Sequence, residues 1–176
     1  KLNSPKSTNT ATDEQPTQSQ SIKQENTSKP NRTLLTRAFT HPPSFEPWFV
    51  RYPEQEGLLR DLYEGLTAYD PEGRIVPGIA ESWETKDNKT WIFTLREGLR
   101  WSNGDPLVAQ DVMLSWQALS QSNSPLRSYL AYLNLKNAKG VLEKNKPFKS
   151  LGIYAENDRT LRIELDKPTP YLPEML

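Results

Sequence analysis

The six residues Trp91-Ile92-Phe93-Thr94-Leu95-Arg96 decide the fold of this chain. Their aromatic and leucine side chains stand at every second position, which is the period of a β-strand with one buried face. Asp87-Asn88 predicts a turn ahead of this strand, and residues 102–106 (Ser-Asn-Gly-Asp-Pro) predict a second turn behind it. We therefore expect a strand whose aromatic face packs into a core.

A helix is expected after the second turn, because Val112, Trp116 and Leu119 recur at helical spacing. This pattern predicts a helix of about ten residues. We expect Trp91, Trp101 and Trp116 to lie in the core of a stable unit that runs from about residue 66 to residue 165.

Two hairpins are predicted on either side of this helix and strand. The turn sequence Asp70-Pro71-Glu72-Gly73 would join a strand at 66–69 to one at 75–76. Residues 151–155 and 161–165 alternate apolar and polar side chains cleanly, so one face of this second hairpin must be buried.

Two further elements are predicted closer to the start of the chain. Apolar residues at three- and four-residue spacing predict a helix over residues 56–65, with Gly65 as its C-terminal cap. The apolar residues between 34 and 39 predict a short strand, which His41-Pro42-Pro43 would end.

Residues 1–32 have the composition of a polar tether. Large apolar side chains are nearly absent, so this stretch cannot bury enough surface to offset the entropy of ordering it, and we expect it to be disordered. One interpretation is the spacer that follows a lipid-bearing cysteine in a bacterial lipoprotein. The alternative is a variable or vector-derived terminus.

The composition argues against several classes of function. Basic and acidic residues number 22 each, so no net positive charge favours binding to nucleic acid. Cysteine is absent, which excludes disulfides, thiolate metal sites and cysteine nucleophiles. No apolar run approaches the roughly 20 residues of a membrane span. The only histidine, His41, has no acidic partner nearby, and no glycine-rich phosphate loop is present. We expect neither an enzyme nor a cofactor or metal site.

One irregular segment remains a candidate for ligand contact. The proline-bounded loop from residue 42 to residue 53 carries Trp48, Arg51 and Tyr52, which are not assigned to any core by their spacing.

Several sequence blocks resemble a known family when they are taken in order. Residues 78–83 (Gly-Ile-Ala-Glu-Ser-Trp), 91–96, 101–106 and 109–112 resemble the oligopeptide- and dipeptide-binding proteins of ABC importers, family 5 of the extracytoplasmic solute-binding proteins. Each block alone is weak, but the ordered set is specific. The resemblance covers the chain after about residue 33 and is strongest to the oligopeptide-binding branch.

This resemblance implies an α/β fold of the periplasmic-binding-protein type (cluster C), in which two lobes close around a ligand. The chain would hold the first strand region of lobe I in residues 33–66 and an adjoining small α+β domain in residues 67–176. The implied function is the substrate-binding subunit of an ABC-type oligopeptide importer, which delivers peptides to the permease. Such a subunit would act as a monomer in the periplasm, or tethered outside the cytoplasmic membrane by a lipid anchor.

The resemblance also implies ligand contacts and two departures from the family pattern. The family position that is often acidic and faces the ligand is Arg51, and Leu126 stands where oligopeptide binders tend to have tyrosine. We therefore take Trp48, Arg51, Tyr52, Leu126 and Arg127 as the candidate ligand-binding residues.

Three alternatives remain open at this point. Arg51 and Leu126 leave room for a relative that binds antimicrobial peptide, haem or murein peptide. A truncated, non-transporting remnant is a second alternative, because no second lobe is present in the sequence. A regulator with a DNA-binding head is disfavoured by the polar start of the chain.

Overall fold

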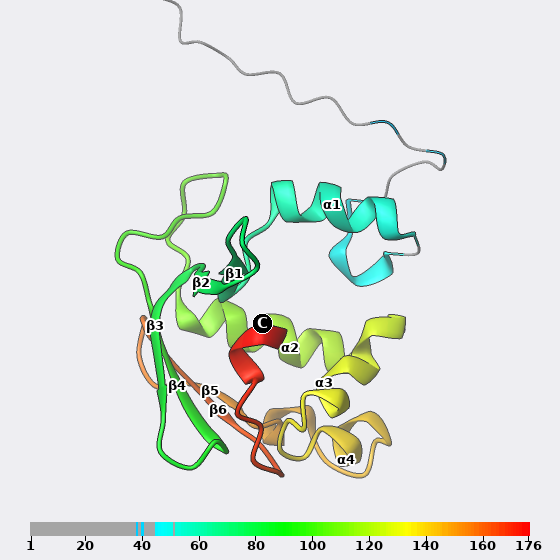
Figure 1. Ribbon diagram of the computed structural model, residues 1–176. Helices are drawn as coiled ribbons and strands as arrows, with labels where there is room; N and C mark the ends of the chain where they lie inside the picture. The colour runs from blue at the N-terminus through cyan, green and yellow to red at the C-terminus, as the bar shows by residue number, and fades with distance from the viewer. Residues whose placement is uncertain (1–37, 39, 41–44, 51) are drawn as a thin grey trace, which may run out of the picture. The chain divides into compact units, whose positions relative to one another are not determined.

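The strand expected at residues 91–96 lies inside a four-stranded antiparallel sheet of order β3-β4-β6-β5 (Figure 1). The computed structural model describes residues 38, 40, 45–50 and 52–176, all within one unit, Arg37–Leu176. The strands of this sheet are β3 Ala80–Thr85, β4 Thr90–Leu95, β5 Ile153–Ala155 and β6 Thr160–Glu164.

The register of the sheet gathers its apolar side chains on one face. Trp91 pairs with Ile163 and Phe93 with Leu161 across β4 and β6, while Ile153 of β5 pairs with the other side of Ile163. All five side chains are buried. The alternation expected for both strand regions is therefore confirmed, although the strand β5 itself begins two residues later than the sequence pattern suggested.

The first hairpin is also confirmed. Its strands are β1 Thr67–Tyr69 and β2 Ile75–Pro77, and they pair antiparallel. The carboxylate of Asp70 accepts hydrogen bonds from the backbone N–H groups of Glu72 and Arg74 at 3.0 and 2.8 Å. Asp70 thereby organises the turn that the sequence predicted.

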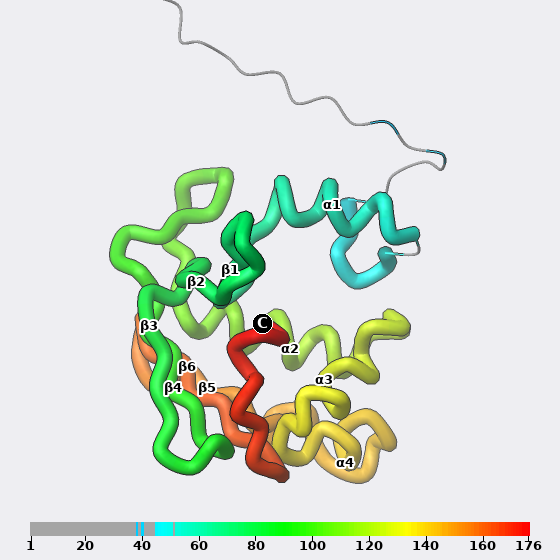
Figure 2. Tube along the Cα trace, in the orientation of Figure 1, coloured from blue at the N-terminus to red at the C-terminus, as the bar shows by residue number. Residues whose placement is uncertain are grey.

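Helices and short 3₁₀ helices connect the strands. The helices are α1 Pro53–Leu62, α2 Ala109–Gln121, α3 Tyr129–Tyr132 and α4 Ala138–Leu142. The 3₁₀ helices are η1 Pro47–Phe49, η2 Pro125–Ser128, η3 Phe148–Ser150 and η4 Leu172–Met175. The expected helix after residue 106 is α2, which contacts β5 and β6 (Figure 2).

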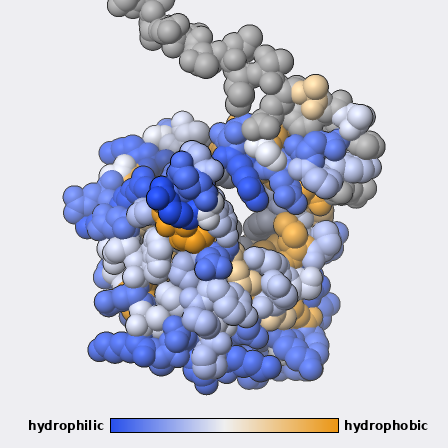
Figure 3. Space-filling view, viewed as in Figure 1, coloured by the Kyte–Doolittle hydropathy of each residue, from blue (hydrophilic) through white to orange (hydrophobic). Residues whose placement is uncertain are grey.

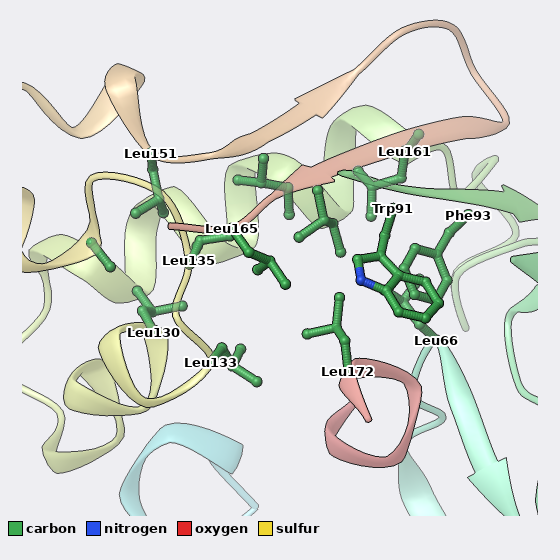
Figure 4. Packing of buried hydrophobic residues seen from close by; sticks show 14 of the residues in the cluster. Leu66, Trp91, Phe93, Leu130, Leu133, Leu135, Leu151, Leu161, Leu165 and Leu172 are labelled. Atoms are coloured by element: carbon green, nitrogen blue, oxygen red, sulfur yellow. The ribbon is translucent and has the colours of Figure 1, made fainter. Parts of the chain in front are cut away.

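The core lies between the sheet and the helices, and Leu172 of η4 points toward Trp91 within it (Figure 4). The cluster draws on the four-stranded sheet, on Leu66 just before β1, on α2 to α4 and on η4, so distant segments share one interior. Its buried members are Leu66, Ala80, Trp91, Phe93, Leu95, Ala109, Leu130, Leu133, Leu135, Ala138, Val141, Leu151, Ile153, Leu161, Ile163, Leu165 and Leu172.

The expected core positions of Trp101 and Trp116 are corrected by the structure. Trp101 is 48% exposed, because it lies in the turn after β4, where its indole N–H donates to an Asp111 carboxylate oxygen at 3.3 Å. Trp116 is half-buried at the edge of the core. The fully buried face of α2 is instead formed by the smaller residues Ala109, Gln117 and Ser120.

The helix expected over residues 56–65 was placed too late in the chain. α1 begins at Pro53, whose fixed backbone angle suits a first helical position, and it ends at Leu62. Tyr63 leaves the helix in an extended conformation, so Gly65 does not cap it. Gly65 serves a different purpose, because its carbonyl oxygen accepts a hydrogen bond from Ile79 at 2.9 Å beside β1.

Four predictions fall on residues outside the described ones. They are the tether over residues 1–32, the strand between 34 and 39, the role of His41 and the ligand contact of Arg51.

Candidate functional site

The loop before α1 is held against η2 by Ser124. The buried hydroxyl of Ser124 donates a hydrogen bond to the carbonyl oxygen of Trp48 and accepts one from the backbone N–H of Leu126 at 3.0 Å. The second bond caps the start of η2. One serine therefore positions both the loop that carries Trp48 and the turn that carries Leu126.

Three of the five predicted ligand-binding residues lie in this region. Trp48 is half-buried in η1, Leu126 is 39% exposed in η2, and Tyr52 is exposed at the residue before α1. Because η1 contacts η2, the structure brings Trp48 and Leu126 onto one surface. Arg51 belongs to the same loop but lies outside the described residues.

Arg127 belongs to a different part of the surface. Its Nη2 donates to the carbonyl oxygen of Leu142, at the end of α4, at 2.8 Å. The side chain lines a hollow of about 510 Å³ together with Lys144 and Lys146, and neither Trp48 nor Leu126 lines this hollow. The structure therefore does not group Arg127 with the other candidate residues.

A second hollow, of about 490 Å³, lies beside the end of α1 and is lined by Tyr63, Tyr69 and Tyr129. Figure 3 shows a hollow in the molecular surface, with hydrophobic side chains on part of its rim and hydrophilic ones on the rest. Tyr129 directly follows η2, so this hollow begins one helical turn beyond Leu126. The Trp48 surface and the tyrosine-lined hollow are thus neighbouring parts of one candidate site, which we call the aromatic site.

The hydroxyl groups of Tyr69 and Tyr129 are ordered by the backbone of η4, whereas the Tyr63 hydroxyl donates to the carbonyl oxygen of Phe45 at 2.9 Å. Tyr69 donates to the carbonyl oxygen of Glu174 at 2.7 Å, and Tyr129 donates to that of Met175 at 3.1 Å. Burial raises the pKa of Tyr129, and the nearby phenols of Tyr132 and Tyr69 raise it further. The Tyr129 phenol therefore stays neutral at physiological pH and presents an aromatic face with a polar edge.

This arrangement suits the binding of an elongated molecule that carries both apolar and polar groups. Aromatic rings pack against apolar side chains, while phenol and backbone groups at their edges exchange hydrogen bonds with a polar backbone. Within residues 38, 40, 45–50 and 52–176, no group of three or more acidic, histidine or cysteine residues is placed to hold a metal ion.

Sequence reasoning missed the tyrosines of this site. Tyr63 falls within the helix expected over residues 56–65, and no sequence feature singles out Tyr69 or Tyr129. Their only signal in the sequence is residue type, since the fold brings them together from three separate segments.

None of the helices in the described part of the chain is long and apolar enough to cross a bilayer.

Comparison with known proteins identifies relatives of this chain. The sequence model of the family described as bacterial extracellular solute-binding proteins, family 5 Middle, matches residues 74–176. A putative binding protein of Haemophilus influenzae is 62% identical over 83% of the chain, and the periplasmic oligopeptide-binding protein OppA of Salmonella typhimurium is 39% identical over 82%. The structure of the Escherichia coli murein tripeptide binding protein MppA superposes with a TM-score of 0.72, at 37% identity over 74% of the chain.

The chain spans only about a quarter of each relative, 28%, 27% and 26% of their respective lengths. The family match covers more than half of the chain, and the structural likeness covers 74% of it. The chain therefore belongs to family 5 of the bacterial extracellular solute-binding proteins, which confirms the expected fold class and the expected location outside the cytoplasm.

Proposed function

We propose that this chain is part of the peptide-capturing subunit of an ABC-type importer and that the aromatic site contacts the peptide. The observation that carries the proposal is the bond from Ser124 to Trp48, which joins the Trp48 loop to η2 next to the tyrosine-lined hollow. The oligopeptide-binding and murein tripeptide-binding relatives support peptide as the ligand class.

In this proposal the subunit performs no chemical step. It would bind peptide outside the cytoplasmic membrane as a monomer and present it to the membrane permease of the importer. The division into a lobe I segment (33–66) and a small α+β domain (67–176) is part of the same proposal. The aromatic site would lie where the two segments meet, because Tyr63 comes from the first and Tyr129 from the second.

The isolated chain should bind peptide weakly. High affinity requires that the ligand be enclosed, so that each of its backbone polar groups exchanges water for a protein partner. Peptide groups that the aromatic site does not enclose would stay hydrated. We expect dissociation constants no tighter than about 1 mM, near −4 kcal/mol.

Calorimetric titration of the chain with a mixed pool of tri- to pentapeptides tests the proposal. Millimolar binding that is lost in Tyr129→Ala and retained in Tyr154→Ala is expected, because Tyr154 lies in β5 beneath Arg162, outside the aromatic site. Equal loss in both variants would contradict the assignment of the site. Micromolar binding that is abolished by changing Arg51 would contradict the proposal that the chain holds only part of a site.

Murein peptide is the second candidate ligand, favoured by the likeness to the murein tripeptide binding protein. Titration with a murein tripeptide beside an oligopeptide of the same length would separate the two, since the tighter ligand identifies the cargo class.

A further inference from the structure

The segment around α4 is strongly basic although the chain as a whole has equal numbers of basic and acidic residues. Between residues 136 and 149, Glu143 is the only acidic residue, and it is engaged by Lys139 at 4.0 Å and by the amide of Asn145 at 3.3 Å. The basic residues of this segment are Lys136, Lys139, Lys144, Lys146 and Lys149.

Part of this charge converges on the 510 Å³ hollow between the end of α2, η2 and the turn after α4. Arg127, Lys144 and Lys146 line the hollow, and the described residues that line it include no carboxylate. Val141 and Phe148 add apolar contacts. The hollow is therefore a cationic pocket, and we use that name for it below.

Arg127 and Lys146 of this pocket are held in place, and none of its three cations is paired with a carboxylate among the described residues. The Arg127 guanidinium is fixed by one bond to the Leu142 carbonyl, which leaves its other N–H groups without a partner among the described residues. The aliphatic part of the Lys146 side chain packs over Gly140, where an added Cβ atom would lie only 3.0 Å from it. The Lys146 ammonium donates a hydrogen bond to the neutral side-chain amide oxygen of Asn137. Lys144 is exposed, and its ammonium has no carboxylate partner in the described part of the chain.

The end of α2 does not require these cations. Helix C-termini attract positive charge when their last carbonyl groups are unpaired. Here the Ser120 hydroxyl donates to the carbonyl of Gln117 at 2.6 Å, and the Ser122 hydroxyl donates to that of Leu119 at 2.8 Å. The backbone N–H of Ser122 also donates to the carbonyl of Ala118 at 3.1 Å. The positive charge is thus available to a ligand.

We propose that the cationic pocket binds a phosphate group. A fixed guanidinium with free N–H groups matches the geometry of phosphate oxygens, and two ammonium groups add point charges around it. A doubly charged anion also relieves the mutual repulsion of three cations better than a single carboxylate does. The group could belong to a phospholipid headgroup or to a soluble phosphate compound, and the proposal does not depend on peptide binding at the aromatic site.

The first experiment titrates the full chain with inorganic phosphate by calorimetry at low ionic strength. Lys144→Gln and Arg127→Gln remove a charge from the pocket, and Lys86→Gln removes one from the β3–β4 turn. We expect saturable binding that weakens about tenfold in both pocket variants and is unchanged in Lys86→Gln. Arg127→Gln removes the bond to the Leu142 carbonyl and can therefore lower stability. In that case Lys144→Gln still tests the proposal. Absence of saturable binding, or equal binding in Lys144→Gln and the parent, would overturn the proposal.

The second experiment distinguishes the two sources of phosphate by co-sedimentation with vesicles of phosphatidylglycerol or of phosphatidylcholine. Sedimentation with phosphatidylglycerol that is lost in Lys144→Gln but not in Lys86→Gln identifies a headgroup. Phosphate binding without vesicle binding identifies a soluble phosphate compound. Vesicle binding that weakens equally in Lys144→Gln and Lys86→Gln would reflect general surface charge and would count against the pocket.

Discussion

The hydroxyl of Ser124 donates a hydrogen bond to the carbonyl oxygen of Trp48, which lies 76 residues earlier in the chain. Ser124 is 1% exposed, so this bond is shielded from water. Through it, the loop ahead of α1 and the turn after α2 form one surface, and the proposed ligand contacts depend on that surface.

Replacing Ser124 by alanine should destabilise the chain by about 1–3 kcal/mol, because the Trp48 carbonyl loses its donor and η2 loses its cap. Urea unfolding measures this cost. Ser128→Ala is a matched control, since the exposed Ser128 hydroxyl bonds only to the Pro125 carbonyl, and it should cost less than about 0.5 kcal/mol. Similar stabilities for the two variants would mean that Ser124 does not hold the loop.

Replacing Phe93 by alanine should cost about 3–5 kcal/mol, because this side chain is fully buried at the centre of the sheet. Trp116→Ala should cost clearly less, about 1–2 kcal/mol, because Trp116 is only half-buried at the edge of the core. Thermal unfolding of both variants checks the order. A larger loss for Trp116 would contradict the packing of α2.

Gly78 should not tolerate alanine. A Cβ at this position would lie 2.3 Å from the carbonyl oxygen of Gly65, so the backbone of one segment would have to move. We expect a loss of about 2–4 kcal/mol in the free energy of unfolding. Gly73→Ala provides the comparison: its backbone is left-handed (φ 78°) but its surroundings are open, so about 1–2 kcal/mol is expected. Equal losses would argue against close contact between Gly65 and Gly78.

Acid should weaken the turn between β3 and β4 through Asp87. Hydrogen bonds from the backbone N–H groups of Thr90 and Lys89, at 2.7 and 2.8 Å, lower the pKa of Asp87. A group whose pKa is lowered by folding stabilises the fold above its unfolded pKa, and this contribution is lost as the pH falls through the folded pKa. The stability advantage of the parent over Asp87→Asn should therefore shrink between about pH 7 and about pH 3. Urea unfolding at both pH values measures it, and an unchanged difference would contradict the assignment.

Much of the sheet could be predicted because its information is local. The alternation around Phe93 and the turn at Asp70 each depend on neighbouring residues, and both were found where expected. Trp101 was misplaced because residue type suggested burial, while its position in a turn exposes it.

The candidate site was less accessible to sequence reasoning. The loop that carries Trp48 was identified by its proline boundaries, but the tyrosines beside it were not, because no local pattern links Tyr69 to Tyr129. Arg127 follows Leu126 directly, yet the geometry of η2 turns its guanidinium toward α4. Such placements depend on long-range contacts that a single sequence does not display.

The most direct test of the proposed function is an amide ¹H–¹⁵N map of the chain titrated with the tri- to pentapeptide pool. We predict saturable shift changes concentrated in η1, in η2 with the following Tyr129, and in η4. Changes confined to the cationic pocket or to the outer face of the sheet, or no saturable change in the millimolar range, would contradict the assignment of the aromatic site as the peptide-contacting surface.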